Sequence, residues 1–108
     1  MRWQVGYLDR KVEEQIESLS KEMRKDFERI VEMIVEFGLE EIHPPLVKHL
    51  EGPLWEIRMR DRNGIARAAY VTASERRVIV VHVFTKKTQK TPRRDIEYAL
   101  KRAKEVLQ

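Results

Sequence analysis

The spacing of apolar residues divides the chain into segments of strand period and segments of helical period. Trp3, Val5 and Tyr7 alternate with small or polar neighbours, which predicts a short first strand. Apolar residues then recur every three or four positions, which predicts two helices before residue 38. The apolar positions are Val12, Ile16, Leu19 and Met23 in the first helix and Phe27, Ile30, Val31 and Ile34 in the second.

Residues typical of helix ends and turns separate these segments. Asp9 and Ser20 are suited to cap the two helices, because their side-chain oxygens can accept hydrogen bonds from first-turn amides. Gly38 is a typical stop for the second helix. The sequence then reads His43-Pro44-Pro45-Leu46, which predicts an extended turn because a residue before proline avoids the helical conformation.

After Leu54 the hydrophobic period changes to two. In LWEIRMR, Trp55, Ile57 and Met59 share one strand face, and Glu56, Arg58 and Arg60 share the other. A hairpin turn is predicted at residues 61–64, which read DRNG. The next strand, IARAAYV, places Arg67 and Tyr70 on opposite faces. After a turn at residues 73–75, VIVVHVF is apolar on both faces, as expected of a buried central strand.

A final helix is predicted from about Pro92, with Thr91 as its cap. Its apolar stripe consists of Ile96, Ala99, Leu100, Ala103 and Leu107. The predicted order is therefore β-α-α-β-β-β-α. We expect an α+β fold over residues 1–108 as a single domain, with an antiparallel meander, two N-terminal helices and a C-terminal helix.

Composition excludes several classes of protein. Of the 108 residues, 42% are hydrophobic and 37% are charged, as expected of a small globular protein. We find neither an apolar run long enough to cross a membrane nor a signal peptide, so we expect a cytoplasmic protein. The absence of cysteine excludes disulfides and thiolate sites. His43 and His49 lack metal-ligand spacing with acids, so neither a metal nor a cofactor is expected.

Charge is divided unevenly along the chain. Residues 1–54 hold 8 Lys+Arg and 12 Asp+Glu, whereas residues 55–108 hold 14 and 6, which together give the net charge of +4. This segregation predicts one basic face, the usual footprint of a polyanionic partner. A mildly uneven surface without such a partner is the alternative.

The densest positive charge lies in residues 86–94, KKTQKTPRR, which we call the basic segment; no acid occurs until Asp95. The positive end of a helix dipole disfavours cations at a helix start, so the two arginines at its end suggest an anionic partner. Crowded lysines can also transfer protons near neutral pH. A solvated loop or a simple anion-binding patch remains the alternative. The cations of the basic segment are Lys86, Lys87, Lys90, Arg93 and Arg94.

Strand order predicts that Arg58, Arg67 and the basic segment reach a common area, which suits the binding of several phosphates. Three further residues have simpler interpretations. His82 lies in an apolar strand and is expected to be buried and hydrogen-bonded. Tyr70 is expected in the core or on a stacking surface, and Glu56 is expected to form a cross-strand ion pair with Arg58.

Three stretches resemble successive signatures of one protein family: LVKHLEGPLWEIRMR, NGIARAAY and VVHVFTKKTQKTPRRDIEYA. They are similar to the HigB-type, phage-derived branch of the RelE/ParE toxin superfamily. The resemblance covers nearly the whole chain, and the pattern F-x-K-K-T-Q-K-T-P before a helix is its most specific part. It implies the RelE-like fold, a small antiparallel sheet with two N-terminal helices and a C-terminal helix.

The resemblance implies a toxin of a type II toxin–antitoxin system, many of which cleave mRNA in the ribosomal A site without metal. Arg67 matches the arginine that stabilises the scissile phosphate, and Lys86 and Lys87 match residues that share phosphate binding and proton transfer. Glu56 stands where some relatives have a lysine, which leaves the general base open. Candidate RNA-binding residues are Arg58, Arg60, Lys90, Arg93, Arg94 and Tyr70.

Three functions remain open at this point. The first is an endoribonuclease whose partners are mRNA, the ribosome and a helix-turn-helix antitoxin, with which it forms a hetero-oligomer. The second is a ParE-like gyrase inhibitor that acts by protein contact. The third is an inactive relative that binds only its antitoxin. The cations of the basic segment and Arg67 favour the ribonuclease.

Overall fold

The computed structural model of the chain describes residues 2–86 and 90–107. Within these residues one sheet, three α-helices and a 3-10 helix make up the fold. In chain order the elements are β1 (Gln4–Tyr7), α1 (Arg10–Glu17), α2 (Lys21–Phe37), η1 (Leu39–Glu41), β2 (Val47–Glu51), β3 (Leu54–Asp61), β4 (Gly64–Ala73), β5 (Arg77–Lys86) and α3 (Arg93–Leu107).

The sheet has the strand order β1-β5-β4-β3-β2. Strands β2 to β5 form an antiparallel meander, while β1 pairs in parallel with β5. The expected α+β class is confirmed, but the sheet is mixed rather than purely antiparallel. Strand β2 is an element that the hydrophobic pattern did not predict, and it lengthens the meander from three strands to four.

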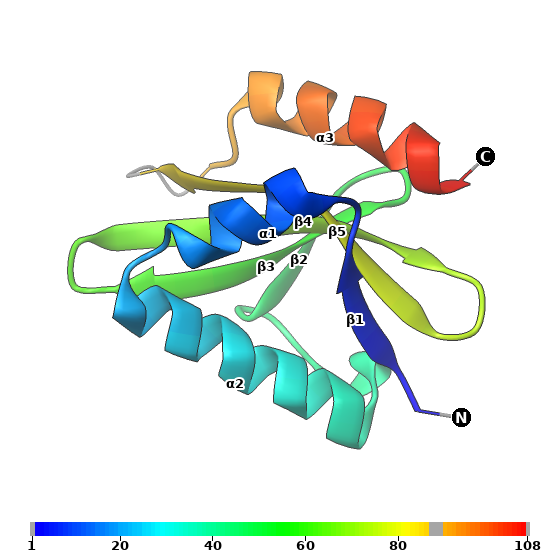
Figure 1. Cartoon of the computed structure of the whole chain (residues 1–108), viewed down its shortest axis with the longest axis horizontal. Coiled ribbons are helices and arrows are strands. Elements are labelled where there is room, and N and C mark those ends of the chain that lie inside the picture. The colour runs from blue at the N-terminus through cyan, green and yellow to red at the C-terminus, as the bar shows by residue number, and fades with distance from the viewer. Residues whose placement is uncertain (1, 87–89, 108) are drawn as a thin grey trace.

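Helices cover both faces of the sheet (Figure 1). Helices α1 and α2 pack on one face, where Ile30, Ile34, Ile57 and Met59 are fully buried in the larger core. Helix α3 packs on the other face over a smaller core, to which it contributes Ala99 and Ala103. No helix in the described part of the chain combines the length and the apolar content of a membrane span.

The predicted caps of the first two helices are confirmed. The Asp9 side chain accepts a hydrogen bond from the Val12 amide at 3.2 Å, and the Ser20 hydroxyl accepts one from the Met23 amide at 3.1 Å. Helix α2 ends at Gly38, whose φ of 96° is one that L side chains rarely adopt. These short-range signals fix where each helix begins and ends.

A β-bulge in β5 sets which of its residues face α3. Ala69 of β4 pairs with His82, whereas the next residue, Tyr70, pairs with Val80, so Val81 is the extra residue. An extra residue reverses the alternation of faces along a strand. His82 consequently lies on the same sheet face as Ala69, which is the face that α3 covers.

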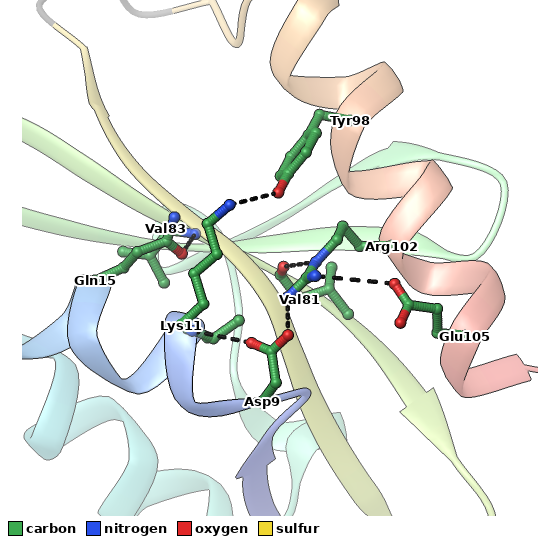
Figure 2. Close-up of polar contacts among 9 residues, drawn as sticks. Asp9, Lys11, Gln15, Val81, Val83, Tyr98, Arg102 and Glu105 are labelled. Carbon is green, nitrogen blue, oxygen red and sulfur yellow. Dashed lines mark hydrogen bonds and ion pairs between the residues drawn. The ribbon is translucent and has the colours of Figure 1, made fainter.

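Helix α1 covers the edge of β5 beyond the point where β1 ends. Strand β1 pairs with β5 only as far as Tyr7 and Val80. Further along β5, the Val83 amide donates to Oε1 of Gln15 on α1 at 3.0 Å (Figure 2). Gln15 therefore supplies the acceptor that a neighbouring strand would otherwise provide.

Two polar contacts also join α1 to α3 across this edge (Figure 2). Arg102 of α3 donates to the Asp9 carboxylate at 2.6 Å, and the Lys11 ammonium lies 3.2 Å from the Tyr98 hydroxyl. Asp9 therefore both caps α1 and pairs with α3, and the Arg102 guanidinium lowers its pKa.

We expect Gln15→Leu to destabilise the protein by about 1–3 kcal/mol, because the Val83 amide would lose its acceptor. Gln15→Glu keeps an acceptor at the same reach and should lose much less. Urea unfolding followed by tryptophan fluorescence measures both variants against the wild type. Equal midpoints for the two variants would show that this hydrogen bond contributes nothing to stability.

Candidate functional site

The pairing of β3 with β4 brings two predicted site residues together. Arg58 and Arg67 are direct partners across the antiparallel ladder. Both lie on the sheet face that α3 covers, since Arg67 is two residues from Ala69 in the α3-side core. Like charges placed opposite each other repel, so this arrangement requires a nearby anion.

Glu56 supplies that anion. It is fully buried, and its two oxygens have different partners. Oε2 lies 3.2 Å from Nε of Arg58, and Oε1 lies 3.8 Å from Nε of Arg67. Oε1 also accepts a 2.7 Å hydrogen bond from the hydroxyl of Thr91, just before α3. The expected ion pair of Glu56 with Arg58 is confirmed, and it runs along one strand instead of across two.

Arg67 is enclosed by the fold, with an exposed fraction of 0%. Burial lowers the pKa of its guanidinium, Glu56 raises it, and Arg58 lowers it again. Arginine remains charged under such conditions because its guanidinium does not deprotonate in proteins. The site therefore contains a fixed positive charge that is shielded from bulk water.

A second buried pair lies beside the arginines. Nε2 of His82 is 3.0 Å from the Asp95 carboxylate on the first turn of α3, and both side chains are about nine-tenths buried. The imidazole stacks on Phe84 and meets the ring of Tyr98 edge-on. Burial lowers the pKa of His82, and the hydrogen bond with Asp95 opposes that effect. The expectation of a buried, hydrogen-bonded His82 is confirmed.

Together these groups form a layer of polar side chains between the sheet and the start of α3, here called the polar layer. The small Ala69 separates Glu56 from His82 in the pairing of the central strands. The members of the polar layer are Glu56, Arg58, Arg67, His82, Thr91 and Asp95.

Arg93, a predicted RNA-binding residue, has acidic partners. Its guanidinium donates to both oxygens of Glu51 on β2, one of them at 3.0 Å, and to Glu97 one turn along α3 at 3.4 Å. These contacts raise its pKa. Acids from other parts of the chain thus neutralise a charge that looks uncompensated in the local sequence.

Three other predicted RNA-binding cations are exposed. Lys90 and Arg94 lie at the surface around the start of α3, and Arg60 lies on β3, two residues beyond Arg58. Arg60 lines a surface hollow together with Arg58 and with residues of α2, among them Asp26. The side chains of Lys90, Arg94 and Arg60 are thus at the surface of the described part of the chain.

The structure does not bring Tyr70 to this face. Tyr70 is 1% exposed and packs in the core beneath α1 and α2, on the side of the sheet opposite Arg67. Burial raises the pKa of its hydroxyl. Such a position is that of a core residue and not of a surface on which a base stacks.

Of the two predicted catalytic lysines, Lys86 ends β5, with its backbone paired to Ile65. Lys87 lies outside the described residues. β5 therefore ends beside the β3–β4 hairpin, with Lys86 two ladder positions beyond the Arg67–Phe84 pair.

Sequence reasoning did not anticipate the roles of Thr91 and Asp95. Thr91 was expected to cap α3, but its hydroxyl donates to Glu56, which is 35 residues away. Asp95 was recognised only as the acid that ends the basic segment. A polar residue at an apolar strand position, such as His82, signals that a buried partner exists but does not identify it.

The chemistry available here is electrostatic stabilisation and proton transfer. Among residues 2–86 and 90–107, no group of three or more His, Cys, Asp or Glu side chains is arranged to hold a metal ion. Two arginines with fork-shaped donors and neighbouring lysines are suited to bind phosphates.

Comparison with known protein families assigns the chain to one of them. A family model described as "Phage derived protein Gp49-like (DUF891)" matches residues 14–104, from α1 to the last turn of α3. The chain belongs to the Gp49-like family. No curated protein matches it.

The Gp49-like family is part of the RelE/HigB-like group of toxins from toxin–antitoxin systems. Membership therefore confirms the toxin-like character that the sequence resemblance implied. It also implies an antitoxin as a partner of this Gp49-like protein.

We expect the free energy of unfolding to fall as the pH drops below about 6.5, by up to about 1.4 kcal/mol per pH unit. Because burial lowers the folded-state pKa of His82, the unfolded chain binds the proton first. Chemical denaturation at a series of pH values between 5 and 7 measures this slope. His82→Gln should flatten it, whereas His49→Gln, at an exposed position, should keep it. A slope unchanged by His82→Gln would contradict this assignment.

Proposed function

We propose that this Gp49-like protein is the toxin of a type II toxin–antitoxin system and a metal-independent endoribonuclease. Its substrate is mRNA on the translating ribosome, in the cytoplasm. The observation that carries the proposal is the facing pair Arg58 and Arg67, held by a buried carboxylate where the basic segment leaves the sheet.

RNA carries its own nucleophile, so a site that stabilises charge and transfers protons is sufficient for cleavage. The 2′-hydroxyl attacks the adjacent phosphorus, the bond from phosphorus to the 5′-oxygen breaks, and a 2′,3′-cyclic phosphate and a 5′-hydroxyl form. A base takes the proton of the 2′-hydroxyl and an acid gives one to the leaving oxygen. Negative charge accumulates on the phosphoryl oxygens in the transition state, where fixed cations stabilise it.

The residues present divide these tasks by their chemistry. Arg67 stabilises the charge on the phosphoryl oxygens, and Arg58 and Lys90 bind neighbouring phosphates. Lys86 and Lys87 bind phosphate and transfer protons, which arginine cannot do because it does not deprotonate. Arg67 itself is 0% exposed, so its guanidinium acts on the phosphate as a fixed buried charge and not as a surface contact.

Glu56 is not assigned as the base. Its carboxylate is fully buried and already accepts the Thr91 hydroxyl while it pairs with two arginines. A base has to reach the 2′-hydroxyl directly or through one water, which this arrangement prevents. The proton transfers therefore belong to the basic segment.

The exposed cations near the polar layer also suit the antitoxin. We assign to the toxin a helix-turn-helix antitoxin that forms a hetero-oligomer with it and opposes RNA binding. An acidic segment of such a partner would compete with phosphate for Lys90 and Arg94, which are both exposed.

We expect Arg67→Ala to reduce mRNA cleavage by about 100-fold or more, because it removes charge stabilisation from the transition state. The test is induction in a host, with pulse labelling of translation and mapping of mRNA 5′ ends. The wild type should arrest translation rapidly with in-frame cleavages, and EDTA should leave cleavage unaffected.

Arg77→Ala is the matched control, because Arg77 is an exposed arginine at the opposite end of β5. Arg67→Lys keeps the buried charge and separates a loss of folding from a loss of stabilisation, with circular dichroism as the check. A fully toxic Arg67→Ala would remove Arg67 from the site. Intact mRNA with arrested replication would favour gyrase inhibition, and no growth effect would indicate an inactive antitoxin-binding relative.

We expect Lys86→Ala/Lys87→Ala to lower the salt dependence of RNA binding by about 1.4 in the slope of log K against log salt, about 0.7 for each phosphate that a lysine no longer neutralises. Fluorescence anisotropy with a 2′-O-methyl RNA oligonucleotide measures binding without cleavage. Arg24→Ala/Lys25→Ala, an exposed basic pair on α2, should leave the slope unchanged. An unchanged slope in the lysine variant would mean that these lysines do not contact phosphate.

A further inference from the structure

We propose that Glu56 is a positioning residue that sets the orientation of Arg67 and Arg58 and ties the start of α3 to them. The inference rests on the proposed function, since it assigns a second role within the same site. Its basis is one buried carboxylate in contact with three segments of the chain.

The two oxygens of Glu56 divide these contacts. Oε2 faces Arg58 on its own strand at 3.2 Å, whereas Oε1 lies between Arg67 on β4, at 3.8 Å, and the Thr91 hydroxyl, at 2.7 Å. Rotating the carboxylate to improve one contact would therefore weaken another. Glu56 therefore links the orientation of the two arginine side chains to the position of residue 91.

Electrostatics explains why an acid serves better here than a neutral residue. Two guanidinium groups paired directly across a ladder repel each other, and one carboxylate between them offsets that repulsion. The group of three keeps a net positive charge, so it can still attract phosphate. Without the carboxylate the arginines would separate, and the electrostatic stabilisation they give the transition state would become less well organised.

The contact with Thr91 extends this control to the basic segment. Thr91 is 7% exposed and lies two residues before the first residue of α3, and β5 ends at Lys86. Residue 86 is thus attached to the sheet through strand pairing, and residue 91 through Glu56. Glu56 therefore fixes the point at which the chain approaches α3.

A positioning role and a purely structural role predict different results for Glu56→Gln. Glutamine keeps the size of the side chain and an acceptor for Thr91, but it removes the charge. If Glu56 positions the arginines, the variant should bind uncleaved RNA as tightly as the wild type or up to about tenfold more tightly. The salt slope of binding should be steeper by about 0.7, because an arginine that Glu56 neutralised becomes available to one more phosphate. The kcat of the variant should fall at least tenfold.

NMR supplies a measurement that does not depend on activity. The Nε–H of Arg67 is buried and should exchange slowly with water in the wild type, giving a resolved ¹H–¹⁵N signal that Arg67→Lys identifies by its loss. Glu56→Gln should broaden this signal or accelerate its exchange. Glu75→Gln, which removes an exposed acid at the β4–β5 turn, is the matched control and should change neither the signal nor kcat.

Thr91→Val keeps the shape of the side chain and all the charges of the polar layer, so it is the alternative test variant if Glu56→Gln does not fold. It should lower kcat with little change in RNA affinity. The proposal is overturned if Glu56→Gln lowers affinity and kcat in parallel with its melting temperature while the Arg67 signal is unchanged. A wild type that cleaves no RNA would instead refute the proposed function, and the NMR signal would still decide the positioning.

Discussion

A fully buried arginine in β4, the middle strand of the sheet, is the constraint on which the α3 side of this protein depends. Placing a charge out of contact with water is costly unless an opposite charge and hydrogen bonds accompany it. Glu56 provides the opposite charge for Arg67, and its own burial then requires further partners. Arg58 and Thr91 meet that requirement. The burial of one cation therefore explains why charged and polar residues lie beside it on two other segments.

The packing of α3 follows a division of the sheet face into an apolar part and a polar part. Near its C-terminal end, the helix presents small residues such as Ala99 and Ala103, which allow it to lie close to the apolar part of the sheet. Near its start it meets the polar layer instead, through Asp95 and the preceding Thr91. The helix is therefore anchored by apolar packing at one end and by specific hydrogen bonds at the other, and the basic segment leaves the sheet beside the polar end.

Local sequence predicted those features that depend on local physics. Helix boundaries followed from Asp9, Ser20 and Gly38, and the alternation around Arg67 already placed Tyr70 on the other face. The parallel pairing of β1 could not be inferred in this way, because nothing in a short strand names its neighbour. β2 escaped prediction since only one of its ends is buried and a proline–proline turn precedes it.

The candidate site shows the same limit. Arg58 and Arg67 could be placed in a common area because a tight hairpin joins their strands, and Glu56 was predicted to pair with Arg58. Thr91 and Asp95, which complete the site from distant positions, could not be predicted in this way. Glu51 reaches Arg93 across 42 residues, and the Val81 bulge that turns His82 toward Asp95 has no composition signal of its own. A cluster of cations in sequence therefore overstates the free charge at a surface until the partners from elsewhere in the chain are known.

The burial of Arg67 also bears on how the proposed reaction is favoured. Charges act more strongly where water is excluded, and groups already held in place do not have to reorganise as the transition state forms. A surface lysine can attract RNA, but its flexible stem leaves the ammonium poorly fixed. A buried arginine beside a fixed carboxylate is held firmly in place but is not exposed to attract RNA. Surface lysines therefore attract the RNA, and the buried arginine stabilises the transition state. On this view the exposed cations attract RNA, and the polar layer stabilises the charge that develops as bound RNA reacts, while the basic segment transfers the protons.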